Sequence, residues 1–69
     1  MGFKDIVQRV ERLVREKEEM TVEELAYIMD VSPTQARYYL KATSAVNSDI
    51  IFHKGRAWVL KQKKEQTEQ

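Results

Sequence analysis

Apolar residues recur at helical spacing along the first quarter of the chain. They follow one another at steps of three and four residues: Phe3, Ile6, Val7, Val10, Leu13 and Val14. On a helix of 3.6 residues per turn, these positions form one stripe about 120° wide. The pattern therefore predicts an amphipathic helix over residues 3–17, with its charged side in solvent.

Two shorter helices follow, each with a start signal. Thr21 stands three residues before Glu24, the spacing of a capping box, and apolar positions at i, i+3, i+4 and i+7 predict a helix over residues 22–29. Ser32 and Gln35 repeat the spacing, with Pro33 at the first helical position, where a missing N–H costs nothing. This predicts a helix over residues 33–43 after a connection of about three residues.

Two β-branched and aromatic runs at residues 50–53 and 57–60 predict a hairpin. With Lys54-Gly55 as a two-residue loop, the predicted partners are His53 with Arg56, Phe52 with Ala57, Ile51 with Trp58 and Ile50 with Val59. One face then carries Ile50, Phe52, Ala57 and Val59. We interpret residues 44–49 as a loop or a frayed helix end with a turn, and residues 61–69, which lack apolar side chains, as a flexible polar tail.

The composition limits the classes of function. The 69 residues, of 8.2 kDa, allow one domain over residues 1–60 and a thin core, so we expect neither an enzyme nor a small-molecule substrate pocket. There is no cysteine and a single histidine, so we expect no metal site and no cofactor. No run is long and apolar enough for a membrane span, and we expect a cytoplasmic protein.

Charge is divided unevenly along the chain, although the formal net charge is only +1. Residues 1–30 carry five basic and eight acidic side chains, whereas residues 31–64 carry seven basic side chains and one acidic, Asp49. Such a division of sign favours a polyanionic partner for the second half of the molecule.

The predicted order of helix, helix, tight turn, helix and hairpin resembles a winged helix-turn-helix domain. The resemblance rests on the run Thr21-Val22-Glu23-Glu24-Leu25-Ala26, on Val31-Ser32, on Ala36, Arg37 and Leu40, and on a hairpin over residues 50–60. It implies a mainly α fold of three helices with a small β-hairpin as the wing. It also implies double-stranded DNA as the partner, with helix 33–43 in the major groove. Thr43 and Asn47-Ser48 stand where the family often has an apolar residue and a glycine.

The helical wheel divides residues 33–43 into two sides. Ala36, Tyr39, Leu40 and Thr43 cluster on the side predicted to face the core. The opposite side carries Thr34, Arg37, Tyr38 and Lys41, with Gln35 at its border. Arg can donate two hydrogen bonds to guanine, and Thr, Tyr and Lys can contact bases or phosphates. We therefore predict these five residues as DNA contacts.

The hairpin tip adds Lys54 and Arg56 as predicted backbone or minor-groove contacts, with Lys61, Lys63 and Lys64 as looser ones. About five neutralised phosphates would give a log–log salt slope of about −4 to −5. Because so small a monomer would bind one site modestly, we also expect a homodimer acting as a transcriptional regulator.

Other classes of function use the same residues differently. A winged-helix adaptor within a larger complex would present Trp58, Tyr38 and the acidic N-terminal half to a protein partner. A domain for RNA or single strands would stack bases on Tyr38 and Trp58. His53 is most simply a surface histidine, and Trp58 most simply packs against the hairpin or the first helix.

Overall fold

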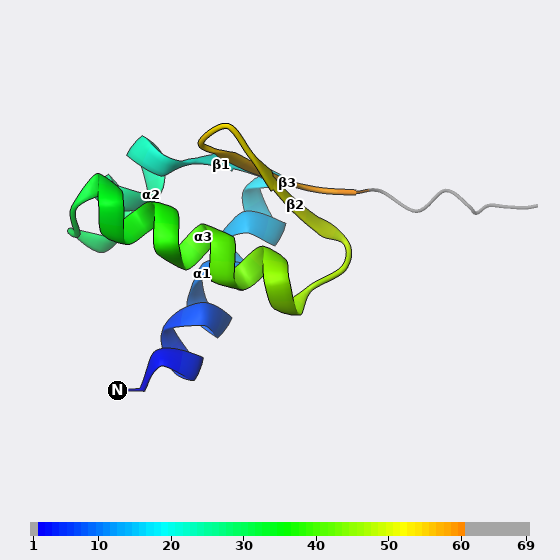
Figure 1. Cartoon of the computed structure of the whole chain (residues 1–69), viewed down its shortest axis with the longest axis horizontal. Coiled ribbons are helices and arrows are strands. Elements are labelled where there is room, and N and C mark those ends of the chain that lie inside the picture. The colour runs from blue at the N-terminus through cyan, green and yellow to red at the C-terminus, as the bar shows by residue number, and fades with distance from the viewer. Residues whose placement is uncertain (1, 61–69) are drawn as a thin grey trace, which may run out of the picture.

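The computed structural model describes residues 2–60, which form three helices and three short strands (Figure 1). In chain order they are α1 (Phe3–Lys17), β1 (Glu19–Thr21), α2 (Val22–Met29), α3 (Pro33–Val46), β2 (Ile50–His53) and β3 (Arg56–Val59). The predicted fold class, mainly α with three helices and a hairpin, is confirmed. The predicted tail, residues 61–69, lies outside the described residues.

Helix α1 has the predicted bounds, and Val7, Val10 and Val14 of the predicted stripe are buried. Ile6 and Leu13 are half-buried, and Phe3 at the start of the stripe is exposed. The helix ends at Glu18, which adopts the left-handed conformation at φ 66°. That conformation turns the chain out of the helix and directly into β1.

Helices α2 and α3 form the predicted helix-turn-helix. The capping box of α2 is complete: the Thr21 hydroxyl accepts from the Glu24 N–H at 3.1 Å, and the Glu24 carboxylate accepts from the Thr21 N–H at 3.1 Å. Asp30 ends the helix in the left-handed conformation. The Val31 N–H then donates to the Ala26 carbonyl at 3.0 Å, which closes the turn.

The capping box predicted for α3 forms only in part. The Ser32 hydroxyl accepts from the Gln35 N–H at 3.2 Å, and Pro33 occupies the first turn as predicted. The Gln35 side chain, however, donates to the Tyr39 hydroxyl at 2.8 Å instead of turning back to Ser32. A buried ring whose hydroxyl lies one helical turn away is the nearer partner for this amide.

Helix α3 continues to Val46, three residues beyond the predicted end at residue 43. The buried Thr43 hydroxyl donates to the Tyr39 carbonyl at 2.8 Å, so a polar residue fits the core side of the helix. Ser44 donates to the Ile50 carbonyl at 2.9 Å, and the Asn47 amide donates to the Thr43 carbonyl at 3.0 Å. These bonds hold the last helical turn in place and reduce the predicted loop to residues 47–49.

The hairpin has the predicted register, from His53 opposite Arg56 to Ile50 opposite Val59. The sheet also contains a strand that was not predicted. Strand β1 pairs antiparallel with β3, which gives the order β1-β3-β2. Glu19–Thr21 contains one apolar side chain in three residues, so no alternation pattern predicts a strand there. The pairing depends on β3, 37 residues further along the chain.

One core lies between the three helices and the inner face of the sheet. Its members with no exposed surface come from every layer: Val10, Val14, Met20, Leu25, Ala36, Leu40 and Ala57. Met20, at the centre of β1, therefore belongs to the core rather than to a linker. Phe52 and Val59 pack against this cluster from the predicted inner face of the hairpin.

Candidate nucleic-acid interface

The two predicted sides of α3 separate in the structure as the helical wheel indicates. Ala36, Tyr39, Leu40 and Thr43 are buried. The predicted contact residues Thr34, Gln35, Arg37, Tyr38 and Lys41 are all exposed, and together they line one open hollow of about 320 Å³. The five helix residues thus form a single continuous surface.

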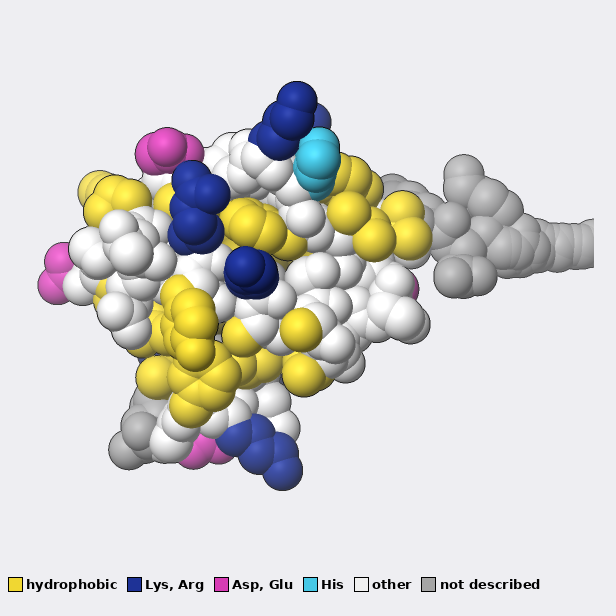
Figure 2. All heavy atoms as spheres, viewed as in Figure 1, with side chains coloured by type: hydrophobic (Ala, Val, Ile, Leu, Met, Phe, Trp, Pro, Cys, Tyr) yellow, Lys and Arg dark blue, Asp and Glu magenta, His cyan; other side chains and the backbone are white. Residues whose placement is uncertain are grey.

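Positive charge on this surface has no acidic neighbour within its own helix. Residues 33–46 contain Arg37 and Lys41 but neither aspartate nor glutamate. Figure 2 looks onto α3: Lys and Arg side chains stand in the middle of this face and at the hairpin tip, whereas Asp and Glu side chains lie toward its margins. The face combines two cations with hydroxyl groups, which suits an anionic partner.

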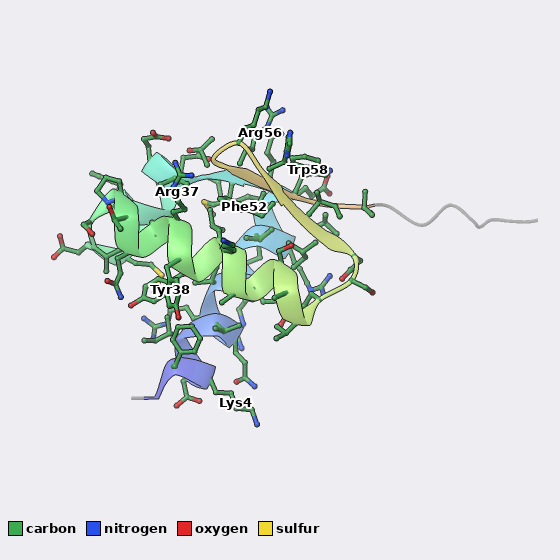
Figure 3. The ribbon with its side chains drawn as sticks, viewed as in Figure 1. Lys4, Arg37, Tyr38, Phe52, Arg56 and Trp58 are labelled. Atoms are coloured by element: carbon green, nitrogen blue, oxygen red, sulfur yellow. The ribbon has the colours of Figure 1, made fainter. Side chains whose placement is uncertain are left out.

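The cations of α3 lie on the side of the helix toward the hairpin. Ser44 follows Arg37 by two helical turns, and it bonds the Ile50 carbonyl at the start of β2. Figure 3 shows Arg37 directed toward the hairpin, with the half-buried ring of Phe52 between helix and hairpin. Helix and hairpin therefore border the same face of the molecule.

Tyr38 stands at the opposite border, toward α1 (Figure 3). Its side chain is 61% exposed, and its ring centroid lies 5.8 Å from that of Phe3 in a tilted arrangement. The contact packs part of the ring against Phe3 and leaves most of the side chain exposed. Tyr38 thus separates the basic surface from an apolar area that begins at Phe3.

The hairpin tip carries His53 and Lys54, both exposed. Lys54 and Gly55 have φ of 52° and 77°, so both central residues of the turn are left-handed, as in a type I′ turn. Glu23, in the first turn of α2, lines the same hollow of about 350 Å³ as Lys54. The tip is therefore less uniformly basic than the local sequence suggests.

Arg56 is already engaged within the protein. Its guanidinium donates to the Glu19 carboxylate at 2.9 Å and lies over the Trp58 ring, 5.8 Å from the ring centroid. Both partners belong to the outer face of the sheet, which is directed away from the core. Half-buried Trp58 packs on the hairpin's other face, as predicted. Contact with DNA would require Arg56 to leave Glu19.

The loop between α3 and β2 is tied to α1 by a cluster of hydrogen bonds. Arg15 donates to both carboxylate oxygens of Asp49, at 2.6 and 3.1 Å, and also to Glu11 and Asn47. The bonds from Arg15 lower the pKa of Asp49, and the bonds to Asp49 and Glu11 raise the pKa of Arg15. This cluster holds the end of α3, and with it the start of the hairpin, against α1.

Residues 2–60 hold no group of three or more side chains suited to a metal ion. None of the three helices is long and apolar enough to cross a membrane. The predicted contacts Lys61, Lys63 and Lys64 lie outside the described residues, so the structure does not place them.

The sequence did not predict that Glu19 pairs with Arg56. Glu19 faces Arg56 because β1 pairs with β3, and Glu19 then lies diagonally across from Arg56 on one face of the sheet. No local pattern connects residues 19 and 56. The only clue in the sequence is the buried Met20, an apolar residue in an otherwise polar connection.

Comparison with protein-family models, with curated proteins and with solved structures gives no match for this chain.

Proposed function

We propose that this protein is a small winged-helix DNA-binding protein that contacts double-stranded DNA through α3 and the hairpin and acts as a transcriptional regulator. The proposal rests on one observation. The exposed face of α3 joins the cations Arg37 and Lys41 to the hydroxyl groups of Thr34 and Tyr38, and α3 contains no acidic residue.

Each side chain has a chemical role in this proposal. Arg37, in the N-terminal half of α3, can donate two parallel hydrogen bonds to the O6 and N7 atoms of guanine. Thr34 precedes it by one helical turn and can reach a base edge or a phosphate. Lys41, one turn later, and the Tyr38 hydroxyl suit phosphate oxygens. Docking in a major groove puts the start of the recognition helix against the bases, which supports Thr34 and Arg37 as the proposed base contacts.

The hairpin would flank the helix as a wing. Lys54 extends from the tip and can contact a neighbouring phosphate, with His53 beside it. Arg56 contributes less in this proposal, because its guanidinium is shared between Glu19 and Trp58. Binding through Arg56 would first break an ion pair, which offsets part of the gain.

The first test is fluorescence anisotropy of the full chain with a mixed-sequence duplex of about 30 base pairs at several salt concentrations. We expect binding at micromolar protein in low salt. The log–log salt slope should be about −3 from Arg37, Lys41 and Lys54, and up to about −5 if further lysines take part. No binding in low salt would overturn the proposal and favour a protein-interaction role for the same surface.

Matched variants locate the binding surface. Arg37→Ala should weaken duplex binding about tenfold and make the salt slope shallower by about 0.9. Arg12→Ala removes the same charge from the exposed side of α1 and should leave both nearly unchanged. Equal losses for the two variants would mean that only overall charge matters, which contradicts the assigned surface.

A competition experiment separates duplex from single-strand recognition. An unlabelled single strand of the same length should displace the labelled duplex less effectively than unlabelled duplex does. The Tyr38 ring packs against Phe3, and the Arg56 guanidinium lies over the Trp58 ring. Neither ring therefore has both faces open for a base to stack on. Stronger competition by the single strand would contradict the proposed partner.

A further inference from the structure

An apolar groove runs beside α1, on the side of α3 away from the hairpin. It has a volume of about 370 Å³ and is lined by Phe3, Lys4, Val7, Gln8, Glu11, Ala42, Val46 and Asn47. Phe3 is 47% exposed and Val46 is 70% exposed, although both are large apolar side chains. Figure 2 shows hydrophobic side chains gathered below α3, over the N-terminal part of α1. An exposed apolar area of this kind indicates an interaction surface.

The two ends of the groove carry complementary groups. Phe3 and Lys4 lie at one end, where the Phe3 ring packs against Tyr38 and Tyr39. Glu11 lies at the other end, beside Val46 and Asn47, since Arg15 bonds both Glu11 and Asn47. Lys4 and Glu11 are seven residues apart, so they point to the same side of α1 at a separation of about 10 Å along the helix axis.

This arrangement is complementary to itself under a two-fold rotation. If a second α1 lies antiparallel to the first, with the axis near Val7 and Gln8, each Lys4 faces the partner's Glu11. Each Phe3 then covers the partner's Val46. An interface in which residue i meets residue j, and j meets i, is the kind that two identical chains form.

We propose that the groove is the surface through which two copies of this chain form an antiparallel, two-fold symmetric dimer, with reciprocal Lys4–Glu11 ion pairs and Phe3–Val46 contacts. The centre of the groove suits close approach, because Val7 is nearly buried and Ala42 has a small side chain. The chain's own C-terminal residues do not suit it, because residues 61–69 include no apolar side chain.

The dimer leaves the basic face of α3 open. At 100° per residue, Ala42 and Val46 point roughly 140° away from the direction of Arg37 and Lys41. The dimer contacts therefore leave Arg37 and Lys41 exposed, and the dimer can be measured without DNA.

The first test is the mass of the full chain by light scattering or sedimentation over a range of concentrations, without DNA. We expect a mass approaching twice 8.2 kDa as the concentration rises. Val46→Asp should return the mass to that of the monomer, because a carboxylate would be buried against Phe3 of the partner. Ala45→Asp is the matched control: it places the same charge one residue earlier on the exposed helix and should leave the dimer intact.

A charge-reversal mixture tests the antiparallel geometry. Lys4→Glu alone and Glu11→Lys alone each place like charges opposite one another and should each weaken the homodimer at least tenfold. A mixture of the two variant chains should dimerise again, because every pair across the interface then joins a lysine to a glutamate. Circular dichroism of each variant verifies that the chain stays folded, since Glu11 also bonds Arg15.

Three results would overturn the proposal. One is a monomer at every concentration up to about 1 mM, at which even a Kd typical of weak contacts would show. Another is a dimer that Val46→Asp and Ala45→Asp affect equally. The third is a mixture of the two charge-reversal variants that stays as monomeric as each variant alone.

Discussion

Lys54 lowers the stability of its turn but supplies a positive charge for the proposed contact with DNA. Its backbone takes φ 52°, a conformation that an ordinary side chain adopts only at an energetic cost, and Gly55 follows at φ 77°. Asparagine is favoured at the first of these two positions. A lysine there is consistent with the proposed contact between its charge and a phosphate at the wing tip.

We therefore expect Lys54→Asn to raise the stability of the fold by about 0.5–1 kcal/mol, because asparagine relieves strain in the turn. The same change should weaken duplex binding and reduce the salt slope by about 0.9, since one cation is lost. Thermal unfolding and anisotropy measure the two effects. Lys41→Asn, within α3, is the control and should not stabilise; a lower melting temperature for Lys54→Asn would contradict the turn assignment.

Asp49 makes the stability of the fold depend on pH. Its pKa is lowered in the folded protein by hydrogen bonds from Arg15. The unfolded chain therefore binds a proton more readily, and stability rises with pH through this range. The contribution is complete above the ordinary aspartate pKa of about 4 and is lost as the pH falls through the lower, folded value.

We expect Asp49→Asn to lower stability at pH 7 by no more than about 1 kcal/mol, because the pair with Arg15 is partly exposed to solvent. The difference from the unchanged protein should be smaller at an acid pH below the ordinary aspartate pKa of about 4, because protonation of Asp49 then begins to remove the bond from Arg15. Melting curves at the two pH values test this. Glu16→Gln, at an exposed carboxylate, should show no comparable loss, and a loss for Asp49→Asn that is the same at both pH values would contradict the ion pair's role.

At the scale of elements, the helix-turn-helix depends on its caps. Helix α2 has only eight residues and would be marginal alone, so the complete capping box at its start matters. The same Thr21 ends β1, and the Val22 N–H donates to the Gly55 carbonyl at 2.9 Å. One short segment therefore joins the start of α2 to the tip of the wing.

Thr21→Ala should cost about 1 kcal/mol of stability, because the Glu24 N–H loses its side-chain acceptor. In a domain of this size, that loss lowers the melting temperature by about 4–8 °C. Thr34→Ala is the control: Thr34 is exposed in the first turn of α3, where alanine favours the helix, so no loss is expected. Equal losses for the two variants would contradict the role of the cap.

At the scale of the whole molecule, β1 joins the N-terminal helix to the wing. Met20 has no exposed surface and contacts a core built from all three helices and the sheet. Strand β1 also places Glu19 against Arg56, which changes the charge of the wing. Strand β1 thus has two effects. Met20 completes the core, and Glu19 pairs with Arg56, one of the cations predicted to contact DNA.

Met20→Ala should cost about 2–5 kcal/mol, since it leaves a cavity in the core that residues 2–60 form. A domain of this kind is stable by about 5–15 kcal/mol at most, so the variant should melt far below the unchanged protein. Met20→Leu conserves most of the volume and should lose less than about 1.5 kcal/mol. A change of only a few tenths of a kcal/mol for Met20→Ala would show that Met20 is not in the core.

The sequence by itself determined the elements whose signals are local. The periodicity of residues 3–17, the caps at Thr21 and Ser32, and the turn at Lys54-Gly55 each depend on neighbours within a few positions, so α1, α2, the start of α3 and the hairpin register were predictable. The division of α3 into buried and exposed sides followed from the same periodicity, which is why its five candidate contact residues lie together.

Only the tertiary structure decided the features that depend on distant partners. Strand β1 exists because β3 offers an edge, α3 extends to Val46 because Ser44 reaches the Ile50 carbonyl, and Arg56 is paired because Glu19 lies across the sheet. The apolar groove between α1 and α3 likewise combines residues 3–11 with residues 42–47. Contacts between residues far apart in the chain form only when packing brings them together, and a single sequence carries no local pattern for them.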